Sequence, residues 1–386
     1  MAEAKRTATP GTPRPSGASA MPRPPLLSDV AAAAHVSITT ASRALDPNSD
    51  HPVKPRTRER VQAAAARLAY HPNPMARALR ARRSPTIAVV VHDVSDPYFA
   101  EIVRGATHEA STHGFLTIVC NSDRDPATEL RYVQMLCLNR VGGVLFAGGG
   151  LEEPAYRREL RGYTQSIGEY GGAIVALAPR AESWAAEIPD NRGGARMVTE
   201  HLLSLGHRSI AMIGGPPFVR TSRERELGYL AAMEAAGAAP WVTTADFSRS
   251  GGADAMSRVL ARRERRITAV FVATDSMALG ALSELRRRGV HVPDDLSVAG
   301  FDDIPGLDFV DPSLTTVRVP MAEIGAAGVS RLFGLFDGKP GRPRIRVHPV
   351  DLVVRDSTSA PRPTRAVRLR LTSSPASALT TTRHRR

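Results

Sequence analysis

Short, continuously apolar segments recur along the chain from residue 86 onward. They are rich in β-branched residues and show no alternation of apolar and polar positions, which is typical of parallel strands covered on both faces. The segments are TIAVVVHDV (86–94), FLTIVCNSD (115–123), GGVLFAGGG (142–150), AIVALAP (173–179), SIAMIGGP (209–216), ITAVFVATD (267–275) and DLSVAGFDD (295–303). They predict parallel strands.

The stretches between these segments carry apolar residues at helical spacing. Examples are YFAEIVRGATHEAST (98–112), NRGGARMVTEHLLSLG (191–206) and SMALGALSELRRRG (276–289), and the last two end in a glycine suited to a left-handed C-cap. Strands alternating with helices form doubly wound βαβ units with right-handed crossovers. The strands are too many for one open sheet. We therefore expect an α/β body of two similar subdomains that binds ligands at the carboxyl ends of its strands.

A different pattern, dominated by small and basic residues, precedes Ser84. Residues 28–45 (SDVAAAAHVSITTASRAL) predict a short helix from Asp29, a turn at His35 and a second helix capped by Ser37. This is a helix-turn-helix arrangement. The inward side chains of the first helix are expected to be Val30, Ala33 and Ala34.

The second predicted helix carries side chains suited to reading DNA. Ile38, Thr39 and Thr40 lie in its first turn and Arg43 about one turn later. Hydroxyls and a guanidinium are the groups that read base edges in a major groove, so the DNA-binding candidates are Ser37, Ile38, Thr39, Thr40 and Arg43. A third helix within 55–70 closes the core with the stripe Val61, Ala65, Leu68 and Ala69. An Ala-rich helical hairpin in an unrelated bundle would look similar.

The segment HPNPMARALRARR (71–83) predicts a short basic helix. Asn73 suits the N-cap and Pro74 the first helical position. A helix of about two turns is unstable by itself in water. It is suited to fold on DNA, where Asn73 and Leu79 are DNA-binding candidates and Leu79 would enter between base steps of the minor groove. The alternative is a charged linker with one exposed leucine.

The formal net charge of +13 is confined to the two ends of the chain. Residues 1–83 hold 14 Lys/Arg and 5 Asp/Glu, and residues 358–386 hold seven Arg and no acid. A polyanion should therefore meet the N-terminal region. Residues 1–25 and 359–386 have few large apolar side chains, so we expect two disordered arms.

Two cysteines in 386 residues fit a reducing compartment. No window approaches eighteen apolar residues, and the N-terminus lacks the apolar stretch of a secretory signal. We expect a cytoplasmic protein with no membrane partner.

Several segments, in their order and spacing, resemble the LacI/GalR repressors. They are DVAAAAHVSITTASRAL, TRERVQAAAARLAYHPNPMARALR, DPYFAEIVRGA, DN followed by LLSLGHRSIAMIGG, ATDSMALGAL, VPDDLSVAGFDDIP and PSLTTVRVPMAEIG, and they span about residues 26–358. The resemblance implies a homodimer on a near-palindromic double-stranded DNA operator. It also implies a periplasmic-binding-protein-like body that binds a small-molecule effector between its subdomains. The effector class that the resemblance favours is a carbohydrate.

The resemblance implies three consecutive regions between the two arms. A DNA-binding head covers 26–72, a hinge helix and linker 73–84, and the effector-binding and dimerisation domain 85–358. Within that domain, the first subdomain is expected to comprise about 85–182 and 316–342, and the second about 183–315 and 343–358.

The same resemblance implies roles for single residues. Ile38, Thr39 and Arg43 match base-contacting positions, and Leu79 matches an intercalating leucine. The implied effector site has a carboxylate (Asp275), a guanidinium (Arg225), two aromatic surfaces (Phe99 and Phe247) and two further candidates, Tyr98 and Arg223. These groups suit a small polyhydroxy or heteroaromatic ligand. Alternatively, Asp275 caps the following helix, Arg225 pairs with Glu224 or Glu226, and the two phenylalanines belong to the core.

Three features depart from the family pattern. Leu26 stands where an N-capping Thr is usual, so Ser28 could take over the cap and displace the first turn. His35 replaces the usual turn glycine and must adopt a left-handed conformation less readily. The stretch between the second and third helices is slightly long.

The chain lacks the short motifs of common enzymes. It contains no GxxxxGK[ST], HExxH, GxSxG or GxGxxG. We therefore expect no catalytic residues, metal or cofactor. The alternative function is a small-molecule receptor with the same body and no DNA specificity, against which the basic head argues.

Overall fold

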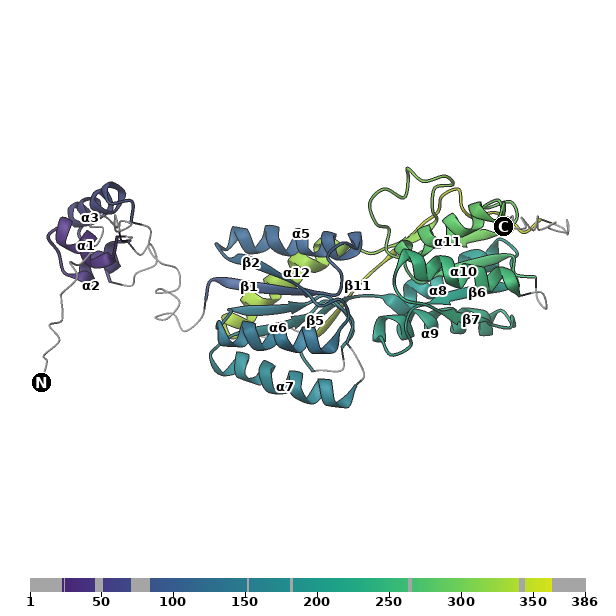
Figure 1. Ribbon diagram of the computed structural model, residues 1–386, viewed down its shortest axis with the longest axis horizontal. Helices are drawn as coiled ribbons and strands as arrows, with labels where there is room; N and C mark the ends of the chain where they lie inside the picture. The colour runs from purple at the N-terminus through teal and green to yellow at the C-terminus, as the bar shows by residue number, and fades with distance from the viewer. Residues whose placement is uncertain are drawn as a thin grey trace, which may run out of the picture. The chain divides into compact units, whose positions relative to one another are not determined.

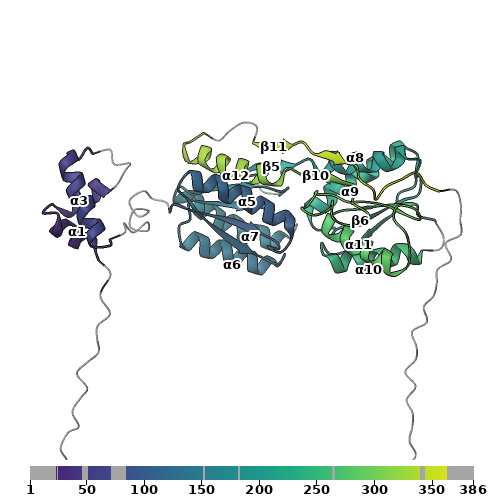
Figure 2. The same ribbon diagram turned by 90° about the horizontal axis from the view of Figure 1, so that it is seen from above.

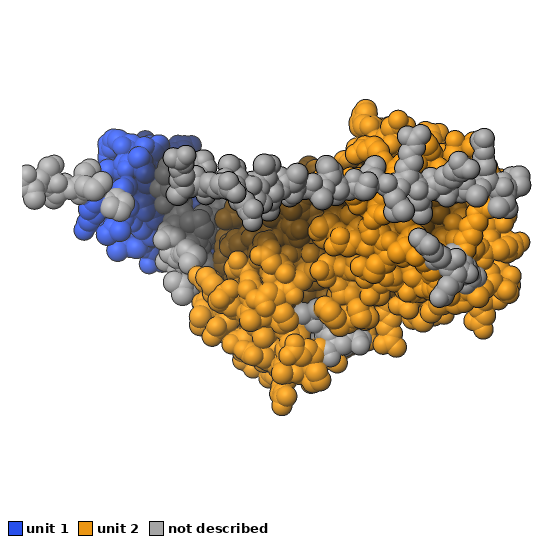
Figure 3. Space-filling model, turned by 45° about the vertical axis from the view of Figure 1, so that its right-hand side comes forward, with its two compact units in different colours: residues 1–77 blue, residues 78–386 orange. Residues whose placement is uncertain are grey.

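The computed structural model describes residue 23 and residues 25–45, 51–70, 84–150, 153–180, 183–262, 266–339 and 344–362. The chain divides into two compact units, residues 1–77 and 78–386, which Figure 3 shows in separate colours. The first unit is built of helices, and the second combines helices with parallel sheets. No helix within the described ranges is long and apolar enough to cross a membrane.

The first unit packs three short helices around a core of small side chains. They are α1 (Leu27–Ala33), α2 (Ile38–Leu45) and α3 (Pro55–Arg67). Alanines allow the helices to approach closely, and the buried residues are Val30, Ala31, Ala34, Ala41, Ala44, Val61, Ala64 and Ala65.

Three details of the first unit differ from the sequence-based expectation. Helix α1 begins at Leu27 and not at Asp29, and Ala31 is buried where Ala33 was expected. Ala69 lies outside α3 with a φ of 49° and is exposed, so Ala64 takes its place in the apolar stripe. The periodicity identified the helices correctly, but it missed how the caps shift their inward faces.

The first half of the second unit is a six-stranded parallel sheet in the order β11-β5-β4-β3-β1-β2. Helices α5 (Pro97–Thr112) and α12 (Met321–Phe336) cover one face, and α6 (Pro126–Leu138) and α7 (Pro154–Glu169) cover the other (Figures 1 and 2). The strands are β1 (Thr86–Val91), β2 (Leu116–Asn121), β3 (Gly143–Phe146), β4 (Ala173–Ala176), β5 (Ala185–Pro189) and β11 (Ile345–His348).

The second half repeats this plan with four parallel strands in the order β7-β6-β8-β9. The strands are β6 (Ile210–Gly214), β7 (Val242–Thr244), β8 (Ala269–Val272) and β9 (Ser297–Ala299). Two helix pairs pack against them, α8 (Asn191–Ser204) with α9 (Arg220–Ala235), and α10 (Arg249–Ala261) with α11 (Asp275–Arg287). An antiparallel pair, β10 (Thr316–Arg318) and β12 (Asp351–Val353), completes this half.

The chain crosses between the two halves three times. The crossings lie between β5 and α8, between β10 and α12, and between β11 and β12. The subdomain limits expected near residues 182, 315 and 342 were all too early, because β5 and β11 belong to the first sheet and β10 packs with α8 in the second half. Strands β5 (AAEIP) and β11 (IRVH) are short and contain charged residues, so a search for apolar runs does not find them.

Strand β2 departs from the expected double coverage. It forms the edge of the first sheet, and Leu116, Ile118 and Val119 are exposed by 67%, 40% and 40%. The other half also exposes an aromatic side chain, Phe309, which is 88% accessible. Large apolar side chains on an open strand edge are typical of a surface that another chain covers.

Candidate functional site

Helix α2 presents one face to solvent and the other to the core of the first unit. Ala41 and Ala44 are buried, whereas Ile38, Thr39 and Arg43 are exposed. Ile38 is 54% accessible and is not among the residues that form or pack against the core of this unit. The exposed face therefore offers one apolar, one hydroxyl and one guanidinium group, the kinds of group that contact bases in a major groove.

The start of α2 is fixed by side-chain hydrogen bonds. The Thr40 amide donates to Ser37 Oγ at 3.1 Å, and the two hydroxyls lie 2.8 Å apart. Ser37 is thus the expected cap, and Thr40 is half-buried beside it. His35 adopts a φ of 48°, which makes the tight turn without glycine. Arg60 Nε of α3 donates to the Ala34 carbonyl at 3.1 Å and ties the turn to the third helix.

Helix α1 starts at Leu27, two residues before the predicted Asp29, and it lacks a hydroxyl cap. Leu26 is the N-cap residue and provides no side-chain hydrogen bond. The Asp29 carboxylate instead accepts from the Leu26 amide at 2.8 Å, half of a capping box. Ser28 does not take over, and the first turn is not displaced. The predicted hinge residues Asn73 and Leu79 lie outside the described residues.

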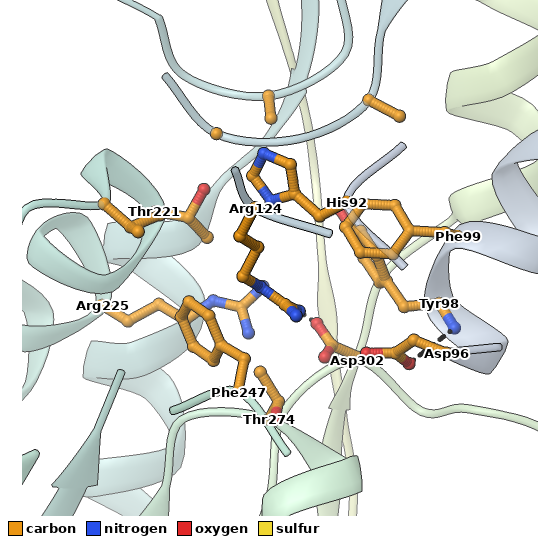
Figure 4. A pocket seen from close by; sticks show the side chains of 14 residues that line it. His92, Asp96, Tyr98, Phe99, Arg124, Thr221, Arg225, Phe247, Thr274 and Asp302 are labelled. Atoms are coloured by element: carbon orange, nitrogen blue, oxygen red, sulfur yellow. Dashed lines mark hydrogen bonds and ion pairs between the residues drawn. The ribbon is translucent and has the colours of Figure 1, made fainter. Parts of the chain in front are cut away.

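A cavity of about 50 Å³ lies in the second unit, where loops of its two halves meet (Figure 4). From the first half come His92, Asp96, Tyr98, Phe99 and Arg124, at or after the carboxyl ends of β1 and β2. From the second half come Thr221, Arg225, Phe247, Thr274 and Asp302. Tyr98, Phe99, Arg225 and Phe247 thus lie where the sequence predicted them, around one cavity.

Arg225 and Asp302 form the charged centre of this cavity. Arg225 is buried on α9, and its Nη2 donates to Asp302 Oδ1 at 2.8 Å. Its Nε donates to Asn191 Oδ1 at 2.9 Å, and its guanidinium lies 3.8 Å from the centre of the Phe301 ring. Burial raises the pKa of Asp302 to about 7, although the charge of Arg225 opposes the shift. Arg225 therefore pairs with neither Glu224 nor Glu226.

Asp302 occupies an unusual backbone conformation. Its φ is 119° and that of the following Asp303 is 56°, both rare for residues with a side chain. Such strain persists only where the surrounding structure holds it and is concentrated at functional sites. The strained backbone brings the Asp302 carboxylate to the cavity.

Asp275 does not present its carboxylate to the cavity, contrary to the expectation. It is fully buried, accepts from Thr316 Oγ1 at 2.6 Å and from the Ile304 amide at 3.2 Å, and so holds the loop that carries Asp302. Burial, followed by the nearby charge of Asp302, raises its pKa well above the ordinary value. It is not the helix cap either, because Thr274 Oγ1 accepts from the Met277 amide.

Arg223, the other weak candidate, is exposed on α9 and is not among the residues lining the cavity. The polar residues that sequence reasoning missed are His92, Asp96, Arg124, Thr221, Thr274 and Asp302. His92, Arg124 and Asp302 follow the ends of β1, β2 and β9 within a few residues. The rule that ligands bind at the carboxyl ends of parallel strands would have found these three.

His92 is neutral at physiological pH. Its ring is buried at the cavity wall and meets Phe99 edge-on, with ring centres 5.8 Å apart. Burial lowers the pKa of His92 to about 4. A Cβ at residue 148 would lie 2.2 Å from its Nε2, so this imidazole requires Gly148.

Comparisons with known proteins bear on both units. A family model for bacterial regulatory proteins of the lacI family matches residues 26–73, and a model for a periplasmic binding protein-like domain matches residues 199–358. The HTH-type transcriptional repressor CytR of Escherichia coli (strain K12) is 34% identical over 337 residues, or 86% of this chain and 96% of CytR.

Solved structures of regulators from the same family are also similar to this chain. A lac repressor dimer bound to operator and the anti-inducer ONPF is similar with a TM-score of 0.77 and 28% identity, covering 88% of this chain and all of that one. The complex of the transcriptional regulator CelR with cellobiose is 33% identical with a TM-score of 0.63, covering 86% and 99%.

Proposed function

The chain belongs to the lacI family of bacterial regulatory proteins, and from this premise we propose that it is a repressor whose affinity for an operator is set by a small effector. The observation that carries the proposal is the exposed face of α2, with Ile38, Thr39 and Arg43 outside a closed alanine core. These three side chains are proposed to contact bases, and Ser37 and Thr40 to fix the start of the helix.

Dimer formation is supported by the exposed apolar surface of the second unit. Leu116, Ile118 and Val119 on the edge strand β2, and Phe309 in the other half, would be covered by a second copy. The lac repressor relative is a dimer on its operator. Two copies related by a twofold axis would place two α2 helices on a near-palindromic site.

The effector is proposed to bind between the two halves, against Arg225, Asp302, Tyr98, Phe99 and Phe247. Asp302 takes the role that the sequence assigned to Asp275. A cavity of about 50 Å³ holds only a few waters, at roughly 10–15 Å³ each, so a ligand must move the halves apart. The three crossings between β5 and α8, β10 and α12, and β11 and β12 are the hinge for this movement.

The relatives support a carbohydrate or a related polyhydroxy compound as the effector class. CelR is described with cellobiose, and a LacI family regulator of Enterococcus faecium with ribose. We propose that this chain acts by binding and not by catalysis, in the cytoplasm where its DNA is found. Leu79 stays a prediction as the minor-groove wedge; Leu79→Ala should weaken specific binding and spare the salt-sensitive non-specific binding.

The test is selection of bound duplexes from a random DNA pool by the purified full chain at moderate salt. A near-palindromic consensus is expected. If Arg43→Ala loses the base preference at one position of that consensus, Arg43 is assigned as the residue that contacts that base. The selected duplex then serves to screen neutral and acidic sugars, because an effector that changes operator affinity must itself bind differently when operator is present. Recovery of no preferred sequence would contradict the proposal.

A further inference from the structure

Arg124 lines the cavity with a buried guanidinium nitrogen that the protein does not satisfy among the described residues. It lies in the loop between β2 and α6, and its side chain reaches toward the middle of the cavity in Figure 4. Its Nε is buried without a hydrogen-bond partner among the described residues. Arginine N–H groups removed from water are costly unless they are hydrogen-bonded. Arg225, by contrast, has its three partners within the protein.

The loop holds Arg124 in this place by an uncommon backbone conformation. Asp123 and Arg124 have φ values of 51° and 58°, two left-handed residues in succession without a glycine. Asn121 joins the loops after β1 and β2, since its Oδ1 accepts from the Val94 amide at 2.7 Å and its Nδ2 donates to Asp123 Oδ1 at 2.6 Å. Strain held by such contacts is typical of a ligand site.

The other half of the cavity contributes an aromatic surface to Arg124. The guanidinium carbon lies 5.7 Å from the centre of the Phe247 ring. This contact orients the guanidinium plane but uses none of its N–H groups. Arg124 therefore links the two halves while its donors stay available to a ligand.

The carboxylates near this guanidinium favour its charge but give its Nε no hydrogen bond. Asp96, Asp93, Asp246 and Asp123 lie close enough to favour its charge, yet burial outweighs them and the pKa of Arg124 is lowered. Asp96 is already engaged, accepting from the Tyr98 amide and from Ser276 Oγ, each at 3.2 Å. The neutral His92 adds no charge beside it. A ligand oxygen at this point would supply the hydrogen bond that Arg124 Nε lacks among the described residues.

We propose that Arg124 anchors an acidic group of the effector, a carboxylate or a phosphate, through a guanidinium whose Nε finds no hydrogen-bond partner among the described residues. A carboxylate or phosphate offers the paired acceptor oxygens that a guanidinium fork matches. The inference rests on the proposed function of the cavity and narrows its ligand from sugars in general to acidic sugars and related oxyanions.

The experiment is calorimetric titration of the full chain, at fixed ionic strength, with matched probes. They are glucose, glucose 6-phosphate and glucuronate, and ribose with ribose 5-phosphate; inorganic phosphate serves as the minimal probe. Wild-type protein is compared with Arg124→Gln, with Arg124→Lys, which keeps the charge but not the fork, and with Arg131→Gln, which alters an exposed arginine on α6. Thermal melting verifies that each variant is folded.

At least one acidic probe is expected to bind wild type and the Arg131→Gln control more tightly than its neutral counterpart. Arg124→Gln should weaken that binding roughly tenfold to a hundredfold, and Arg124→Lys less. A phosphate-only or glucuronate-only response identifies the oxyanion.

Three results would overturn the proposal: binding of neutral probes alone, binding of no probe, or equal binding to Arg124→Gln. The affinity of the same samples for the selected operator is measured without probe. If operator binding is intact, one of these three results counts against this inference alone, whereas loss of operator binding counts against the proposed function.

Discussion

The buried carboxylate of Asp302 predicts a pH dependence of stability that one substitution should remove. Its pKa is about 7 in the folded protein because of burial, against an ordinary value of 3.8. The folded chain therefore retains a proton that the unfolded chain releases, and stability falls as pH rises from about 4 to about 7. Between pH 5 and pH 8 this difference corresponds to about 2.5 kcal/mol.

Asp302→Asn keeps the shape of the side chain and removes its titration. It replaces the carboxyl group that accepts from Arg225 by an uncharged amide, which resembles the protonated Asp302 of the wild type at low pH. Any change in stability that the amide itself causes does not titrate, so it is the same at pH 5 and pH 8 and cancels in the comparison. Relative to wild type, the free energy of unfolding of Asp302→Asn should thus rise by about 2.5 kcal/mol from pH 5 to pH 8.

The assay is urea denaturation at several pH values, followed by the fluorescence of Trp184 in one half and Trp241 in the other. The lowered pKa of His92 acts in the opposite direction between about pH 4 and 6.5, but it is common to both proteins. Asp308→Asn, which alters an exposed carboxylate of the same loop, is the matched control. A difference between Asp302→Asn and wild type that stays constant within about 0.5 kcal/mol from pH 5 to pH 8 would refute the reasoning.

Three further predictions concern the head and the dimer. Arg43→Ala should relax the preference at one operator position by about 1–3 kcal/mol, measured by competition among single-base variants, and an unchanged consensus would remove Arg43 from the reading face. Leu26→Ser should add the missing cap of α1, about 1 kcal/mol, and slow amide exchange in that helix about fivefold; unchanged exchange would show that Asp29 already suffices. Ile118→Lys should place a charge on the exposed edge of β2 and shift sedimentation from dimer toward monomer, whereas a persistent dimer would move the interface elsewhere.

The sequence alone determined the class of each unit. Continuous apolar runs fixed β1, β3, β6 and β8 because strands buried on both faces tolerate only apolar side chains. Local chemistry was equally sufficient for α2, where Ser37 caps the helix and His35 makes the turn. Such features depend on neighbours within four residues, which a sequence displays directly.

Only the tertiary structure decided which polar groups reach the cavity. Asp275 and Asp302 both follow a strand, but their carboxylates point to different partners. The carboxylate of Asp275 accepts from Thr316, 41 residues away in sequence, and that of Asp302 accepts from Arg225, 77 residues away. Likewise Arg124 meets Phe247 from the other half. Side-chain direction at a strand end depends on the backbone turn that follows and on distant partners, and no local pattern records either.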